Sequence, residues 1–319
     1  MMTLRSSPSD RGGGVIIDPA RASKVLIDLM HHYGEKTQIY KYTHRIDAPQ
    51  TVHRPSALVV GSLEHARWLF FAAMTDRREV SEMVYRGHNA LWAEHANLLY
   101  NKPLDAHFSE DSLQGLLMTR GFGMPSTAAR DWKHCSATLF TWLRGDPRLL
   151  YEGRTIDNIV DMKKRGIILS GFGPKILSLL AIFYAELDMI ALPRDAFPVD
   201  VHVQRFALST GIAKIKKTTQ NVHLERALRP FLAHLCFDHG WSVVEVSHAI
   251  WLLGNRLCTG CSRHSMASSF CPAYSVCQGP YETRSYFKKG RWDHEAQSPQ
   301  GDKRPYGLPP LEVSLFPVT

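Results

Sequence analysis

The sequence predicts an all-α protein. Apolar residues recur at the three- and four-residue spacing of a buried helix face over most of the 319 residues. Ser, Asp or Pro precedes several of these stretches, which is the usual start of a helix. Stretches with strand-like alternation are not found, and no repeat is visible. With 44% hydrophobic residues, a chain of this length can bury two cores.

The elements are expected in the following order. Residues 1–14, rich in Ser, Pro, Arg and Gly, are expected to be disordered. A helix over 19–33 ends before Gly34, and Ser62 is placed to cap the next one. Helices then follow at spacings set by their apolar residues, over 80–101, 127–144, 221–237 and 242–253.

A glycine turn lies between two apolar stretches in the middle of the chain. Gly171 and Gly173 allow φ > 0, and Pro174 favours the first position of a helix. We therefore expect two short helices joined by a tight turn. The N–H groups of the turn and of the second helix would point outward together, as in an anion site suited to a DNA phosphate. The glycines alone favour an ordinary helix–helix turn, because Gly-x-Gly before a helix is common.

Two charged residues follow this turn. Lys175 lies in the first turn of the second helix, where the macrodipole disfavours an ammonium group. Burial would disfavour the charge further, and a neutral amine can attack an electrophilic carbon. Asp200 precedes another apolar stretch and is expected to cap a helix. Each residue alone has a structural explanation, but their combination with the turn indicates a reactive site.

These residues resemble the helix-hairpin-helix DNA glycosylases of the endonuclease III superfamily. That family has a Leu-Pro-Gly-Val-Gly-x-Lys hairpin followed by Val-Asp-Thr-His. Here 169–175 and 199–202 match, with Ser170, Phe172 and Val201 as substitutions. The interval from Lys175 to Asp200 is longer than in endonuclease III.

The resemblance implies roles and an architecture. Lys175 falls on the lyase lysine and Asp200 on the catalytic aspartate. Gly171, Phe172 and Gly173 would grip a DNA phosphate. A six-helix lobe would span 57–197, and a second lobe would join 15–56 to 198–278. Lys175 and Asp200 would then face each other across a cleft that receives an extruded nucleotide.

Four of the six cysteines lie within 20 residues near the C-terminus: Cys258, Cys261, Cys271 and Cys277. No apolar signal segment is visible near Met1, so a reducing compartment and a metal are favoured over disulfides. Four thiolates suit either tetrahedral zinc or an iron–sulfur cluster. The other two, Cys135 and Cys236, lie in apolar surroundings typical of buried packing residues.

The resemblance favours a 4Fe–4S cluster over zinc. Family members carry Cys-x6-Cys-x2-Cys-x5-Cys after an apolar helix, and here an apolar helix likewise leads into Cys258. The last pair keeps the family spacing. The first three read Cys-x2-Cys-x9-Cys, which moves the second ligand early. The cluster is expected to be structural.

Charge and hydropathy indicate the partner. The net charge of +8 and the pI near 9.2 favour a polyanion. Lys163 and Lys164 precede the hairpin and are expected to contact double-stranded DNA. The same lysines would also be found on a helix face that only contacts solvent. No apolar stretch reaches the length of a membrane span. An intracellular, DNA-associated monomer is expected, in the cytoplasm and nucleoid or in a nucleus.

The resemblance therefore implies a bifunctional DNA glycosylase with abasic-site lyase activity in base-excision repair. Oxidised pyrimidines are the favoured substrates. The alternatives are a monofunctional glycosylase acting on an oxidised purine or a mismatched base, and a DNA-binding protein without catalysis. Ala73 takes the position of the intercalating glutamine of endonuclease III, and Met74 beside it is either a substitute or a buried helix residue. The tail 279–319 has no counterpart, and its basic and aromatic residues either follow DNA or cover the second lobe.

Overall fold

The structure is a computed structural model. It describes residues 14–41, 48–76, 81–104, 108–167, 169–215, 218–254, 257, 271–277, 285–288 and 290–294. The chain forms two compact units, one of Arg45–Pro198 and one of Met1–His44 with Val199–Thr319. The lobes expected from the sequence were 57–197 and 15–56 with 198–278. Of the predicted disordered segment, residues 1–13 lie outside the described residues.

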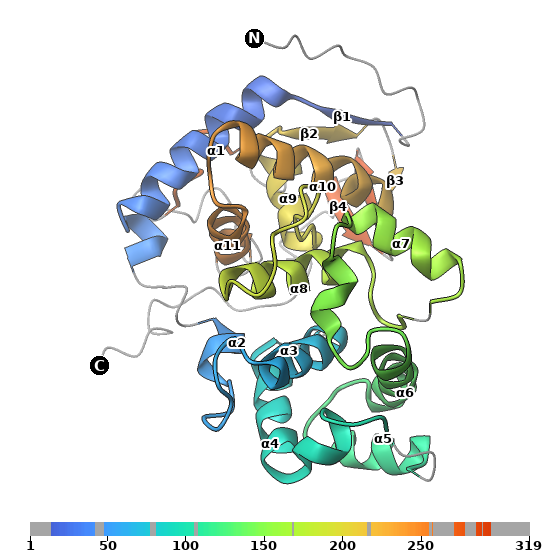
Figure 1. The fold of residues 1–319 in the computed structure, drawn as a ribbon. Helices are drawn as coiled ribbons and strands as arrows, with labels where there is room; N and C mark the ends of the chain where they lie inside the picture. The colour runs from blue at the N-terminus through green and yellow to red at the C-terminus, as the bar shows by residue number, and fades with distance from the viewer. Residues whose placement is uncertain are drawn as a thin grey trace, which may run out of the picture. The chain divides into compact units, whose positions relative to one another are not determined.

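The unit Arg45–Pro198 is helical in the residues that the structure describes (Figure 1). Its elements are α2 (Pro49–Val52), α3 (Leu63–Thr75), α4 (Ser81–Leu99), α5 (Glu110–Thr119), α6 (Pro125–Thr141), a 3-10 helix (Pro147–Tyr151), α7 (Ile156–Lys164) and α8 (Pro174–Glu186). Ser62 caps α3 by accepting a hydrogen bond from the His65 N–H, as predicted.

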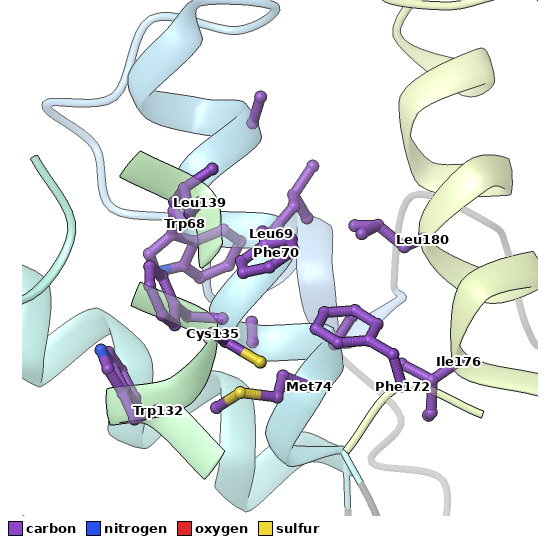
Figure 2. Packing of buried hydrophobic residues seen from close by; sticks show 14 of the residues in the cluster. Trp68, Leu69, Phe70, Met74, Trp132, Cys135, Leu139, Phe172, Ile176 and Leu180 are labelled. Carbon is purple, nitrogen blue, oxygen red and sulfur yellow. The ribbon is translucent and has the colours of Figure 1, made fainter. Parts of the chain in front are cut away.

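The core of this unit surrounds α3. Phe71 stacks on Trp132 of α6 with ring centroids 4.6 Å apart, and Phe70 lies 4.7 Å from the Phe172 ring. Figure 2 shows Phe172, Ile176 and Leu180 beside the α3 side chains. Met74 is fully buried within this core, which confirms the buried reading of that residue.

The second unit combines helices with short strands. Its helices are α1 (Pro19–Gly34), a 3-10 helix (Gln38–Lys41), α9 (Val201–Ser209), α10 (Asn221–Asp238) and α11 (Val243–Leu253). Its strands are β1 (Val15–Ile17), β2 (Ala213–Ile215), β3 (Thr218–Gln220), β4 (Ser285–Lys288) and β5 (Arg291–His294).

The strands form two small antiparallel sheets. β1 pairs with β2, and the second sheet has the order β3-β5-β4. The sequence did not predict them, because three or four residues are too few for alternation to be visible. The all-α class nevertheless holds, since each of the described strands has only three or four residues. None of the described helices is both long and apolar enough to cross a membrane.

Candidate functional site: a glycine hairpin, a lysine and a capping aspartate

The glycine turn joins α7 to α8 as a tight hairpin. Gly171 has φ +83°, a left-handed conformation that only glycine adopts without strain. Gly173 is the N-cap of α8 and has extended backbone, with φ −89° and ψ 176°. Pro174 occupies the first position of the helix, as predicted.

The hairpin leaves a group of backbone donors unused. Gly173 has no side chain to cap α8, and Pro174 has no N–H. Among the described residues, the N–H groups of Gly173, Lys175 and Ile176 have no protein acceptor. A Cβ added at Gly173 would meet no atom within 4 Å, so the approach to these donors is open. The arrangement fits an anion at the N-terminus of α8.

Side chains beneath the turn hold it in place. Phe172 is fully buried against Phe70, so neither the side chain nor the backbone of this residue, which was predicted to contact DNA, reaches solvent. On α6, the Cys135 thiol donates to the Ser170 carbonyl at 3.0 Å, and His134 Nδ1 lies 3.1 Å from Ser170 Oγ. Cys135 is buried, as predicted. The hairpin is therefore held to the core through both Phe172 and Ser170.

The two lysines predicted to contact DNA already have partners within the protein. Lys163 Nζ donates to the Phe172 carbonyl at 2.6 Å, which ties the end of α7 to the turn. Lys164 Nζ pairs with Asp161 at 2.7 Å on an exposed face, and this hydrogen bond lowers the pKa of the Asp161 carboxyl. Lys163 thus supports the hairpin, and DNA contact by either lysine stays a prediction.

Lys175 is the second residue of α8 and is half-buried. The helix that carries it is firmly held in its own unit. The Tyr151 hydroxyl donates to the Leu177 carbonyl at 2.8 Å, and the Tyr184 hydroxyl donates to the Ala66 carbonyl of α3 at 2.7 Å. Both tyrosines are buried, which raises their pKa values well above the usual value. The base of the Lys175 side chain is therefore a rigid platform.

Asp200 is the N-cap of α9, which confirms the predicted cap. Its Oδ1 accepts hydrogen bonds from the N–H groups of His202 at 2.8 Å and Val203 at 2.9 Å. Among the described residues Oδ2 has no donor, and the side chain is half-buried. The carboxylate is thus oriented by one oxygen while the other remains available.

The start of α9 is tightly packed against α11. A Cβ added at Gly254 would lie 2.6 Å from His202 Cβ, closer than any real contact. The helix before the cysteine segment therefore ends against the first turn of α9. Lys175 and Asp200 belong to different units, Arg45–Pro198 and the unit beginning again at Val199. Their meeting across a cleft stays a prediction.

Half of the predicted metal-ligand set is described. Cys271 and Cys277 are half-buried at the two ends of one compact turn, in which the Cys277 N–H donates to the Ala273 carbonyl at 2.7 Å. Cys258 and Cys261 lie outside the described residues. Within the part of the chain that the structure covers, no three His, Cys, Asp or Glu side chains gather as metal ligands.

One residue links this turn to α9, and sequence reasoning missed it. Arg21 of α1 donates through Nη2 to the Val276 carbonyl at 2.6 Å and through Nε to the Thr210 carbonyl at 2.8 Å. Thr210 is the C-cap of α9. An arginine on a helix of mixed polarity carries no signal of this role, because its partners are backbone carbonyls about 190 and 255 residues away.

Comparison with known proteins supports the fold. No protein-family model matches the sequence, and no curated protein is similar to it at a significant level. Among solved structures, a trapped covalent intermediate of endonuclease III with DNA, described as an estranged-adenine complex, matches with a TM-score of 0.53. Its identity is 16%, and the match covers 84% of this chain and 99% of that one. A non-covalent endonuclease III–DNA complex matches with a TM-score of 0.52, also at 16% identity, over 84% and 98% of the two chains. The chain therefore has the fold of endonuclease III.

Proposed function

We propose that this protein is a DNA glycosylase of base-excision repair that also cuts the strand at the resulting abasic site. The observation that carries the proposal is Lys175, placed in the first turn of α8 directly after a hairpin with three unused backbone donors. The donors would hold a phosphate of the DNA backbone close to the lysine. The similarity of fold to two DNA complexes of endonuclease III supports a DNA substrate.

The chemistry proposed for Lys175 is nucleophilic. Its amine attacks the C1′ carbon of the damaged nucleotide, and the C1′–N bond to the base breaks as the base leaves with a proton. Opening of the sugar ring gives an imine between Lys175 and C1′. Loss of a proton from C2′ then expels the 3′ phosphate by β-elimination, and water releases the lysine. The damaged nucleotide must be turned out of the helix to reach the amine.

Asp200 would assist the first step. Because Oδ1 is used in capping α9, the carboxylate has a defined direction, and Oδ2 is available to stabilise positive charge on the sugar or to transfer a proton. We propose oxidised pyrimidines as the substrates. A panel of duplexes, each with one damaged or mismatched base, tests this choice.

Cys258, Cys261, Cys271 and Cys277 would hold a 4Fe–4S cluster. Four thiolates suit such a cluster, and the described pair brackets a turn that Arg21 ties to α1 and α9. The cluster would supply stability to this segment rather than reacting with DNA. A purified protein that is brown, with broad visible absorption and four iron atoms per chain, agrees with this assignment. A colourless protein containing one zinc ion contradicts it.

Borohydride trapping tests the lysine directly. Borohydride reduces an imine between protein and DNA to a stable amine, so wild-type protein and DNA with an abasic site should form a covalent adduct. Lys175→Gln should abolish it, while Lys102→Gln, which removes an exposed lysine elsewhere in the same unit, should not. An adduct that survives Lys175→Gln contradicts the assignment. The absence of any adduct, with base release retained, indicates a monofunctional glycosylase.

Asp200→Asn separates base removal from strand cutting. Asparagine still caps helices, so α9 should remain folded. We expect release of a damaged base to fall at least about a hundredfold, the usual scale for a positioned acid–base group. Trapping on a preformed abasic site should persist, because that step needs no base removal. Equal loss of both reactions would indicate that Asp200 is needed for folding rather than for the reaction.

A further inference from the structure

A C-terminal hairpin of β4 and β5 is docked next to α9. β5 pairs antiparallel with β3, so that Trp292 lies opposite Thr219. Trp292 is only 2% exposed, and its Nε1 donates to Oε1 of Gln204 on α9 at 2.7 Å. A tail segment thus places one large side chain inside the unit that carries Asp200.

The contact is part of a closed set of hydrogen bonds. Gln204 Nε2 donates to the Asn221 carbonyl at 3.2 Å, and the Asn221 N–H donates to the Gly290 carbonyl in the hairpin turn at 3.0 Å. Gln204 is 3% exposed, and both the oxygen and the nitrogen of its buried amide have hydrogen-bond partners inside the protein. Removing one partner would leave a buried polar group unpaired, which costs more than the bond contributes when it is present.

Gln204 also connects this set to Asp200. It lies four residues after Asp200, and its N–H donates to the Asp200 carbonyl at 3.0 Å. Residues at this spacing lie on one face of a helix, so a fixed Gln204 restrains the first turn of α9. The bonds from His202 and Val203 to Asp200 Oδ1 lie within that same turn.

We infer that the β4–β5 hairpin is a positioning element for Asp200. Trp292 acts through Gln204 and keeps the first turn of α9 in the direction that presents the Asp200 carboxylate. The catalytic part of this inference rests on the proposed function. The sequence allowed two roles for the tail, following DNA or covering the second lobe. The inference gives Trp292 the second of these roles.

The test uses three variants of the full chain. Trp292→Phe keeps an aromatic ring but removes the donor to Gln204. Trp292→Phe combined with Gln204→Met removes donor and acceptor together, so that neither is buried unpaired, and should recover most of the lost thermal stability. Trp241→Phe makes the same change at a half-buried tryptophan that stacks on His239 after α10, and serves as the control.

Two quantities are measured: hydrogen exchange of residues 201–205 and the single-turnover rate of base release at saturating DNA. We expect Trp292→Phe to speed the exchange and slow the rate by about tenfold, with DNA affinity unchanged, because a small misplacement of a catalytic group costs this much or more. The double variant should stay slow although its stability recovers. Trp241→Phe should match wild type in both measurements.

Recovery of the rate together with stability in the double variant would overturn the inference, since the hairpin would then only stabilise. If Trp292→Phe does not fold, the double variant, which lacks both donor and acceptor, is compared with wild type directly, and a wild-type rate in it overturns the inference. Wild-type protein without base release would contradict the proposed function instead. In that case, faster exchange at residues 201–205 in Trp292→Phe supports the restraint of α9, and unchanged exchange overturns it.

Discussion

At the scale of single residues, the two hairpin glycines have different reasons to be glycine. Gly171 needs its left-handed φ of +83° to close the turn. Gly173 has a backbone conformation open to other residues, and an added Cβ would meet nothing within 4 Å. The first glycine is therefore a requirement of folding, whereas the second keeps space free next to the unused N–H groups.

This difference predicts opposite effects of the same substitution. Gly171→Ala should lower the free energy of unfolding by about 1–2 kcal/mol, the cost of a left-handed alanine. Gly173→Ala should leave stability within about 0.5 kcal/mol, as surface changes usually do, but should weaken DNA binding because its methyl group lies where a phosphate approaches. Thermal denaturation and fluorescence anisotropy with a duplex measure the two effects. Equal DNA affinity of Gly173→Ala and wild type would show that no phosphate binds there.

At the scale of elements, the capping positions could be read from the sequence and the supporting contacts could not. Ser62, Pro174 and Asp200 were found because each acts on backbone within three residues. Phe172, taken for a DNA contact, is buried because hairpin geometry turns its side chain toward Phe70. Trp292 and Arg21 bond to residues about 90 to 250 positions away, a pairing that local pattern cannot reveal.

Arg21 is the element-scale contact whose loss is simplest to measure. Arg21→Lys keeps the charge but cannot bond the Thr210 and Val276 carbonyls at once, because lysine lacks the guanidinium fork. We expect amide exchange of residues 271–277 to accelerate. Iron of the proposed cluster should be lost to a chelator about tenfold faster, because each hydrogen bond from a charged donor contributes about 1.5–3 kcal/mol.

Lys24→Gln, on the exposed face of the same helix, should change neither quantity. Equal metal loss from both variants would mean that α1 has no specific hold on the cysteine turn. Faster exchange without metal loss would mean that the turn keeps its ligands in place by itself.

At the scale of the whole molecule, two buried histidines contribute to the loss of stability in acid. Burial lowers the pKa of His88 to about 3, and burial together with the nearby Arg54 lowers that of His65 to about 4. His88 is held between the hydroxyls of Thr75, at 2.7 Å, and Tyr100, at 2.8 Å. In the unfolded chain both histidines titrate near 6.5.

The sign of the effect follows from proton uptake. Between pH 6.5 and about 3–4 the unfolded state binds more protons than the folded state, so stability is lost as the pH falls and is constant above about 6.5 with respect to these groups. Melting temperatures from pH 8 to 4 should therefore decline below 6.5. His65→Gln should reduce the slope, whereas His239→Gln, at an exposed position, should not. An unchanged slope in His65→Gln would contradict the role of His65.

The discontinuous unit has a consequence for synthesis on the ribosome. Residues 45–198 form a compact unit from one continuous stretch and can fold as soon as they emerge. The unit that carries Asp200 needs both β1, near the start of the chain, and β5, which ends at His294. Until Trp292 has left the exit tunnel, Gln204 has no indole to bond, and the first turn of α9 lacks the restraint that this bond supplies. The order of translation thus makes the aspartate-bearing unit mature after the unit of residues 45–198.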